Sequence, residues 1–309
     1  MGAGDRRPPV GGGTAVRDRT LSTVGDVLEL VRAPAALTVI GDTIAGGYAG
    51  GGKLRPRQWL LPLASVFLYS GGMALNDYAD RKLDAVERPE RPIPSGRIAP
   101  GRALGIAAAC MAVGLSLAAT GGGRRGLAVA VPLVGAIVSY NMVFKDSPIG
   151  PVSMAACRGL DVMMGAGGTR AAAPAAAALA LHTAGVTAQS RGEVHGGSTG
   201  VALAGIAATG VTAIAAVSGG GTRSAGALAG ALVGGAAYAG TVLPSQLAAL
   251  DDPSAANVRT ATRTGIGAMI PLQATLVART GAFLPALALG AVDLLRRGLA
   301  TRRRAGDVT

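Results

Sequence analysis

The sequence predicts an all-α membrane protein, a polytopic bundle of nine or ten transmembrane helices. Of its 309 residues, 50% are hydrophobic and only 15% are charged. The apolar residues come in nearly uncharged blocks of about 17 to 20, the length that spans roughly 30 Å of hydrocarbon. A soluble chain would divide them among shorter amphipathic segments. Ten blocks qualify, with the count open only for the last two: 31–50, 59–79, 103–120, 126–144, 151–168, 171–189, 199–218, 225–243, 264–280 and 282–297.

The segments around these blocks predict a simple domain organisation. Residues 1–25 have Arg, Pro and Gly but no apolar core, so we expect a disordered cytoplasmic tail and not a signal peptide. Short connections then predict one membrane domain at 26–300, followed by a basic tail at 301–309. Glycine supplies 49 residues, which either lets membrane helices approach closely or reflects a GC-rich genome. Cys110 and Cys157 fall inside apolar blocks and indicate neither a disulfide framework nor a metal site.

The net charge of +12 indicates orientation in a membrane and not a nucleic-acid partner. The basic residues stand at block ends without interleaved aromatic residues. With the N-terminus in the cytoplasm, the inner segments hold 20 Lys and Arg residues and the outer loops eight. This is the bias expected of membrane proteins. We therefore expect a multi-pass protein of the cell membrane whose polar stretch at 76–98 faces the cytoplasm. Its oligomeric state is not indicated.

That stretch, NDYADRKLDAVERPERPIPSGRI, follows the second apolar block directly. If the helix continues to Asp84, steps of about 100° place Asn76, Asp77, Asp80 and Asp84 within one quarter of its circumference. Neighbouring ionised carboxylates repel one another, and a bound divalent cation would offset that repulsion. A set of oxygen ligands without His or Cys favours Mg²⁺ or Ca²⁺ as this cation. Mg²⁺ in proteins often completes its coordination shell with phosphate oxygens, and arginine side chains also bind phosphate. Three arginines follow the acidic residues: Arg88, Arg91 and Arg97. The alternative is a solvated helix end with charge pairs.

Two charged residues, Arg158 and Asp161, lie inside the fifth apolar block. Intramembrane charges usually face the bundle interior or a cavity, and the spacing of i and i+3 suits mutual pairing. Cavity lining and a structural ion pair both remain open. His182 is predicted to be a buried polar residue with a partner on another helix. The aspartates at 251–252 precede Pro253, which favours a turn over a metal site.

The stretch at 76–98 resembles the first aspartate-rich motif, NDxxDxxxD, of the UbiA family of intramembrane prenyltransferases, with the R-P-x-R-P-I-x-S-G-R-I sequence typical of that family. SYNMVFK at 139–145 is similar to the family's Y-S-x-x-L-K element and supplies Tyr140 and Lys145. Arg32, in LVRAPAALTVIGD, stands in the usual place on the first helix. ACRGLDVMMGAG and TAQSRGEVHGG resemble an actinobacterial EboC-like branch of the family.

The resemblance implies a bundle of helices around a central cavity that opens to lipid, with the chemistry at its cytoplasmic end. The implied reaction is the Mg²⁺-dependent transfer of an isoprenyl group from a polyprenyl diphosphate to an unidentified lipophilic or amphipathic acceptor. The implied metal ligands are Asn76, Asp77, Asp80, Asp84 and Glu193. The implied diphosphate-binding residues are Arg88, Arg91, Arg97, Lys145 and Arg191. The implied catalytic residues are Lys145, Tyr140, Arg158 and Asp161.

Two departures from the family pattern leave alternatives open. The R-x-x-N motif of the first helix ends here in Ala35, and Asp42 either replaces the missing ligand or serves packing. The second acidic motif has no aspartate. Glu193 either holds a metal with Gln189 or forms a salt-bridged loop, and Arg191 could instead pair with the diphosphate directly. The alternative function is therefore a non-catalytic carrier or binder of a polyprenyl or phospholipid.

Overall fold

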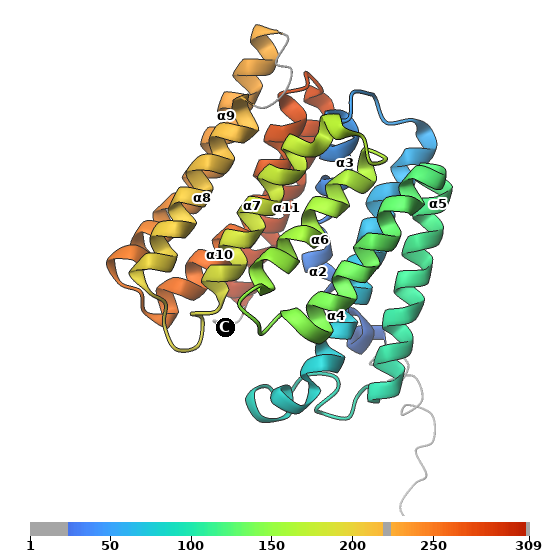
Figure 1. Cartoon of the computed structure of the whole chain (residues 1–309). Coiled ribbons are helices and arrows are strands. Elements are labelled where there is room, and N and C mark those ends of the chain that lie inside the picture. Colours follow the sequence, from blue (N-terminus) through green and yellow to red (C-terminus); the bar gives the residue numbers. More distant parts are fainter. Residues whose placement is uncertain (1–23, 219–223, 307–309) are drawn as a thin grey trace, which may run out of the picture.

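The computed structural model describes residues 24–218 and 224–306, and within these ranges all regular structure is helical, without a strand. The helices run side by side between the two ends of one bundle (Figure 1). The predicted all-α bundle is confirmed. Most of the expected tail at 1–25 and the end of the basic tail at 301–309 lie outside the described residues.

The chain that leads into and through the first apolar block, 31–50, is a broken helix. A helical segment at 24–30 is followed by Arg32, whose φ of 49° and ψ of 49° are left-handed. The chain then continues through α2 (Ala33–Ala36) and α3 (Ile40–Ala49). For a residue with a side chain this conformation costs about 1–2 kcal/mol, so the surroundings of Arg32 must compensate for it.

The next two elements form the part of the bundle that carries the acidic stretch. Helix α4 (Leu60–Glu87) extends three residues beyond Asp84, as the sequence predicted. Helix α5 (Pro100–Ser139) reverses at Gly123, where φ is 62° and ψ is −154°. Its two arms are the predicted blocks at 103–120 and 126–144. The arms approach so closely that a Cβ atom on Gly126 would lie 2.7 Å from the carbonyl oxygen of Ala118.

The remaining helices complete the bundle. They are α6 (Gly150–Gly165), α7 (Ala173–Ser190), α8 (Thr199–Ser218), α9 (Ala225–Asp251), α10 (Ala255–Ala278) and α11 (Phe283–Gly306), with a π-helical turn at Tyr140–Phe144 and 3₁₀ turns at Pro56–Trp59 and Arg170–Ala172. With the α5 arms counted separately and 24–49 as one segment, the described residues form ten helical rods, the upper of the two predicted numbers. Within residues 24–218 and 224–306, five helices are long and apolar enough to cross a membrane. Helix α10 begins nine residues before the predicted block at 264–280.

Glycine decides how closely α3 and α6 pack. A Cβ atom on Gly46 would collide with the carbonyl oxygen of Val162, and one on Gly165 would collide with the main chain of Thr43. Small residues permit such contact between membrane helices, which burial of apolar surface alone drives only weakly. This contact brings the polar residues of α3 within reach of those on α6.

We expect Gly46→Ala to destabilise the protein by about 1–3 kcal/mol, because the added methyl group must displace the α6 backbone. Gly105 is a matched control, since it lies on α5 with nothing within 4 Å of its Cβ position. Gly105→Ala should leave stability unchanged or raise it, as alanine favours helix. Thermal unfolding in detergent measures both variants, and equal melting temperatures would contradict close packing at Gly46.

Candidate active site

The residues of the 76–98 stretch gather at the end of the bundle where α4 ends and the connection to α5 turns back, at the bottom of Figure 1. Asp77 and Asp84 are 4% and 3% exposed. Both contact one nitrogen of Arg91, whose Nη1 lies 3.5 Å from Asp77 Oδ1 and 2.7 Å from Asp84 Oδ2. Arg32 Nη2 donates a second hydrogen bond to Asp77 Oδ1 at 3.0 Å. This ion pair links the strained Arg32 to α4.

Asp80, between these two carboxylates, has a different partner. Lys145 Nζ donates to its Oδ1. Lys145 follows the π-helical turn, and its amide donates to the carbonyl of Tyr140 at 2.9 Å. Single π turns inside helices are often found at functional sites. Three carboxylates of α4 therefore pair with three cations from other segments, a group we call the charge ring: Asp77, Asp80, Asp84, Arg32, Arg91 and Lys145.

The other cations expected to bind diphosphate have partners of their own. Arg97 donates to Asp26 and to Glu29 and so holds the 24–30 helix against the α4–α5 connection. Arg191 donates to the main-chain carbonyl of Ser147 and, at 3.3 Å, to that of Lys145. Both residues therefore position loops beside the charge ring, and each must exchange partners to bind a phosphate. Arg88 is exposed at the C-terminus of α4.

The expected metal ligands do not form a cage of protein atoms alone. Among the residues that the structure describes, no three His, Cys, Asp or Glu residues come close enough to hold a metal ion. Glu193 lies in the loop after α7, where its main-chain carbonyl accepts from Arg259 Nη1 at 2.7 Å. Mg²⁺ commonly takes only one or two carboxylates and fills its shell with water and phosphate. Asp77 and Asp84, which reach the same Arg91 nitrogen, fit that requirement.

Of the two alternatives for Arg158 and Asp161, the mutual ion pair is not formed. Arg158 Nη1 instead pairs with Asp42 Oδ2 at 3.0 Å, and Asp161 accepts from Ser65. Asp42, fully buried, also accepts from Gln273 Nε2 at 2.6 Å. Each α6 residue thus pairs with a different helix, because the glycine contact between α3 and α6 brings Asp42 to Arg158. Asp42 serves the core and does not replace the ligand missing at Ala35.

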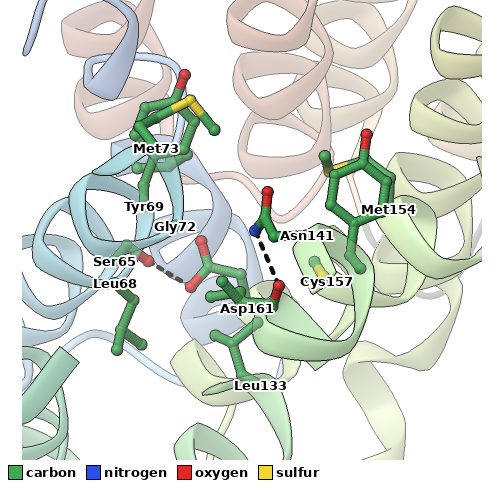
Figure 2. A pocket seen from close by; sticks show the side chains of 13 residues that line it. Ser65, Leu68, Tyr69, Gly72, Met73, Leu133, Asn141, Met154, Cys157 and Asp161 are labelled. Carbon is green, nitrogen blue, oxygen red and sulfur yellow. Dashed lines mark hydrogen bonds between the residues drawn. The ribbon is translucent and has the colours of Figure 1, made fainter. Parts of the chain in front are cut away.

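A small cavity of about 70 Å³ lies between α4, α5 and α6 (Figure 2). The Ser65–Asp161 hydrogen bond forms part of its wall, and Tyr140 and Asn141 of the π turn also line it. Most of the remaining lining is apolar: Val39, Leu68, Gly72, Met73, Leu133, Ile137, Met154 and Cys157. Asp161 and Tyr140 therefore face a cavity, whereas Arg158 is not part of its lining.

Several cavity residues were not singled out in the sequence, although it carried a signal for them. Ser65, Tyr69 and Gly72 recur at helical spacing on α4, and Asn76 and Asp80 continue the same face. The cavity wall and the charge ring are thus successive parts of one helix face.

The predictions for two other polar groups are confirmed. His182 is buried, with its Nδ1 2.8 Å from the hydroxyl of Tyr238 and its Nε2 2.9 Å from the carbonyl of Gly265. Asp252 Oδ1 accepts from the amide of Ser254 at 3.2 Å, which is turn geometry. Neither group joins the charge ring.

Comparison with known proteins identifies a family for part of the chain. Residues 38–190 match the UbiA prenyltransferase family. The chain is 39% identical over 154 residues to the digeranylgeranylglyceryl phosphate synthase of Methanopyrus kandleri, a match covering 48% of this chain and 55% of that protein. It is 34% identical over 131 residues to the enzyme of the same name from Natronomonas pharaonis, covering 41% and 46%. The matches thus span about half the length of these relatives.

Solved structures share the fold. A UbiA homologue from Aeropyrum pernix K1 superposes with a TM-score of 0.64 at 17% identity, over 78% of this chain and 96% of that one. A homologue from Archaeoglobus fulgidus bound to DMAPP and Mg²⁺ gives 0.54 at 15% identity, over 80% and 98%. The sequence relatives are archaeal synthases, so the expected actinobacterial EboC-like branch was wrong.

We expect Arg158→Met to destabilise the protein by about 3–5 kcal/mol, because it leaves the Asp42 carboxylate buried without its cation. Adding Asp42→Asn to the same chain should recover most of that loss, since the amide no longer needs a counter-charge. Chemical denaturation in detergent of both single variants and the double variant gives the coupling energy. Additive effects would show that the ion pair does not carry the stability.

Proposed function

Because residues 38–190 match the UbiA prenyltransferase family, we propose that the chain transfers an isoprenyl group from a prenyl diphosphate to an acceptor within the membrane. The observation that carries the proposal is the charge ring beside an apolar cavity, on one face of α4. A prenyl diphosphate has the matching shape, with a polyanionic head and an apolar tail. Tyr140 joins the two parts, since it lines the cavity and bonds the Lys145 amide.

The charge ring is balanced before substrate arrives, with three carboxylates against three cations. Diphosphate oxygens would become new partners for Arg91 and Lys145, since guanidinium and ammonium groups bind phosphate well. Asp77, Asp80 and Asp84 would then be free to hold Mg²⁺. When bound, Mg²⁺ supplies a Lewis acid that stabilises charge on a leaving diphosphate. On binding, the cations would exchange carboxylates for diphosphate and the carboxylates would exchange cations for Mg²⁺, so no buried charge would be left without a partner.

Transfer breaks the bond between the allylic carbon and the diphosphate oxygen, and negative charge grows on that oxygen. Lys145 and Arg91 stabilise the growing charge because they are already held in place before the reaction. The apolar cavity walls keep water from the electron-deficient allylic carbon until an acceptor hydroxyl forms the new C–O bond, and the hydroxyl proton passes to the released diphosphate. Asp161, fixed by Ser65, adds a polar group to the same cavity.

For the acceptor we propose a glycerol-linked phosphate, in keeping with the names of the archaeal relatives. Such an acceptor brings another phosphate to the site, which requires cations beyond those that hold the diphosphate. Exposed Arg88 and Arg191 lie on the segments next to the charge ring and meet this need.

One observation favours the second candidate function, a carrier that binds a prenyl lipid without catalysis. The second acidic motif holds only Glu193, which lies beyond the segment matched to the family. A carrier would retain the lipid and release no diphosphate.

We expect Asp77→Asn and Asp80→Asn each to lower Mg²⁺-dependent diphosphate release at least about 100-fold, the usual loss when a group that stabilises transition-state charge is removed. Glu87→Gln is the matched control, because it removes an exposed carboxylate from the end of the same helix. The assay supplies labelled prenyl diphosphates and Mg²⁺ to membranes, followed by mass analysis of the lipid extract. Lipid binding without release in the unmodified protein would support the carrier instead.

We expect Gly72→Leu to select against long donors, because the new side chain would enter the cavity. A Cβ atom there already lies 3.0 Å from Ile137 Cγ2. The kcat/KM for geranylgeranyl diphosphate should fall at least about tenfold more than that for dimethylallyl diphosphate, the usual effect of a few methylenes in an apolar pocket. Gly105→Leu, in open space on α5, should alter neither. Equal losses for both donors would place the tail elsewhere.

A further inference from the structure

A second pocket, of about 340 Å³, lies at the opposite end of the bundle from the charge ring. Its walls come from the α3–α4 connection at 50–58, the reversal of α5 near Gly121, and the end of α6 with residues 164–167. These segments meet at the top of Figure 1, whereas α4 ends at the bottom. Neither the proposed reaction nor the family comparison assigns it a role.

Four cations line this outer pocket: Lys53, Arg55, Arg57 and Arg125. None has a carboxylate within 4.0 Å in the part of the chain that the structure describes. The sequence explains why, since the stretches 43–76, 91–145 and 162–192 contain no Asp or Glu. Like charges gathered without a counter-charge repel one another, so an anion in the pocket would stabilise this arrangement.

The pocket is held open by contacts of its own. The Gln58 side chain accepts from the Arg55 amide at 2.7 Å and closes the turn that carries Arg57. A Cβ atom on Gly121 would lie 3.1 Å from the Arg57 carbonyl, so the α5 reversal packs closely against this turn. Glycines also form much of the wall, which leaves main-chain groups accessible: Gly50, Gly51, Gly52, Gly122, Gly165 and Gly167.

Helix dipoles do not account for these cations. Lys53 and Arg55 follow the C-terminus of α3, where positive charge is favourable. Arg57, however, lies in the 3₁₀ turn just before α4, at a helix N-terminus, where the dipole disfavours a cation. These four residues also make up half of the eight basic residues at the end that the charge bias marks as outer. Their presence there needs another reason.

The depth of the pocket in the membrane supplies one. Trp59, the only tryptophan of the chain, belongs to the same turn as Arg57 and is 48% exposed. Exposed tryptophan marks the level of lipid headgroups. We propose that the outer pocket binds the phosphate group of an anionic phospholipid in the leaflet opposite the charge ring. The proposal is independent of prenyl transfer.

Trp59 makes the site measurable, because bromine on a nearby lipid quenches tryptophan fluorescence. The full chain is placed in phosphatidylcholine vesicles with a minor fraction of brominated phosphatidylglycerol, or with the same fraction of brominated phosphatidylcholine. The anionic lipid should quench Trp59 more strongly. Each cation removed should weaken that preference about fivefold, equivalent to the ~1 kcal/mol of one basic residue at an anionic surface. The variants are Arg57→Gln and Arg125→Gln.

Arg124→Gln is the matched control, since Arg124 is exposed beside Arg125 but does not line the pocket. Its lipid preference should equal that of the unmodified chain. Equal quenching by both brominated lipids, or the same loss in Arg124→Gln as in Arg125→Gln, would overturn the proposal. A further arm adds inorganic phosphate against sodium chloride of equal ionic strength. Release of the preference by phosphate but not by sodium chloride would support recognition of the phosphate group, whereas equal release by both salts would show unspecific charge attraction and overturn the proposal.

Discussion

The arrangement of the first half of the bundle depends on the buried carboxylates of α4 having cations beside them. Asp77 and Asp84 are nearly inaccessible, and a buried carboxylate without a partner is strongly destabilising. Their partners come from segments far apart in sequence, since Arg32 precedes α4 and Arg91 lies on the connection from α4 to α5. The third carboxylate, Asp80, pairs with Lys145, which follows α5. The ion pair of Arg32 also offsets its left-handed conformation. The groups that hold this end together are therefore those that the proposed reaction uses.

A second buried polar group ties the core together further inside the bundle. Asp42 forms an ion pair with Arg158 of α6 and accepts a hydrogen bond from Gln273 of α10. Asp161 accepts a hydrogen bond from Ser65 of α4. Four helices are thus linked by charged or polar contacts in an apolar setting, where each contact is strong and each unpaired group costly. The cavity borders this group through Asp161, so its shape depends on the same contacts.

The sequence predicted well whatever depends on neighbouring residues. Block length predicted the helices, and a continuous helix to Asp84 placed the acidic residues together at one end. Prediction from the sequence failed where the interaction partner of a residue lies on another helix. Spacing favoured Arg158 with Asp161, yet each has a partner across the bundle. The first block appeared continuous, because apolar content does not reveal the left-handed conformation of Arg32 or the turn at 37–39. The spacing of Ser65, Tyr69 and Gly72 carries a local signal for the cavity face of α4.

By itself, the sequence determined that the chain forms apolar helices and that one of them ends in a group of carboxylates without His or Cys beside them. Both follow from local rules, the hydrocarbon thickness and a period of 3.6 residues. Only the tertiary structure decided which cation neutralises each carboxylate, and that four outer cations from two loops share one pocket. Such contacts depend on the register between packed helices. That register is decided by small residues such as Gly46 and Gly165, whose partners are distant in the chain.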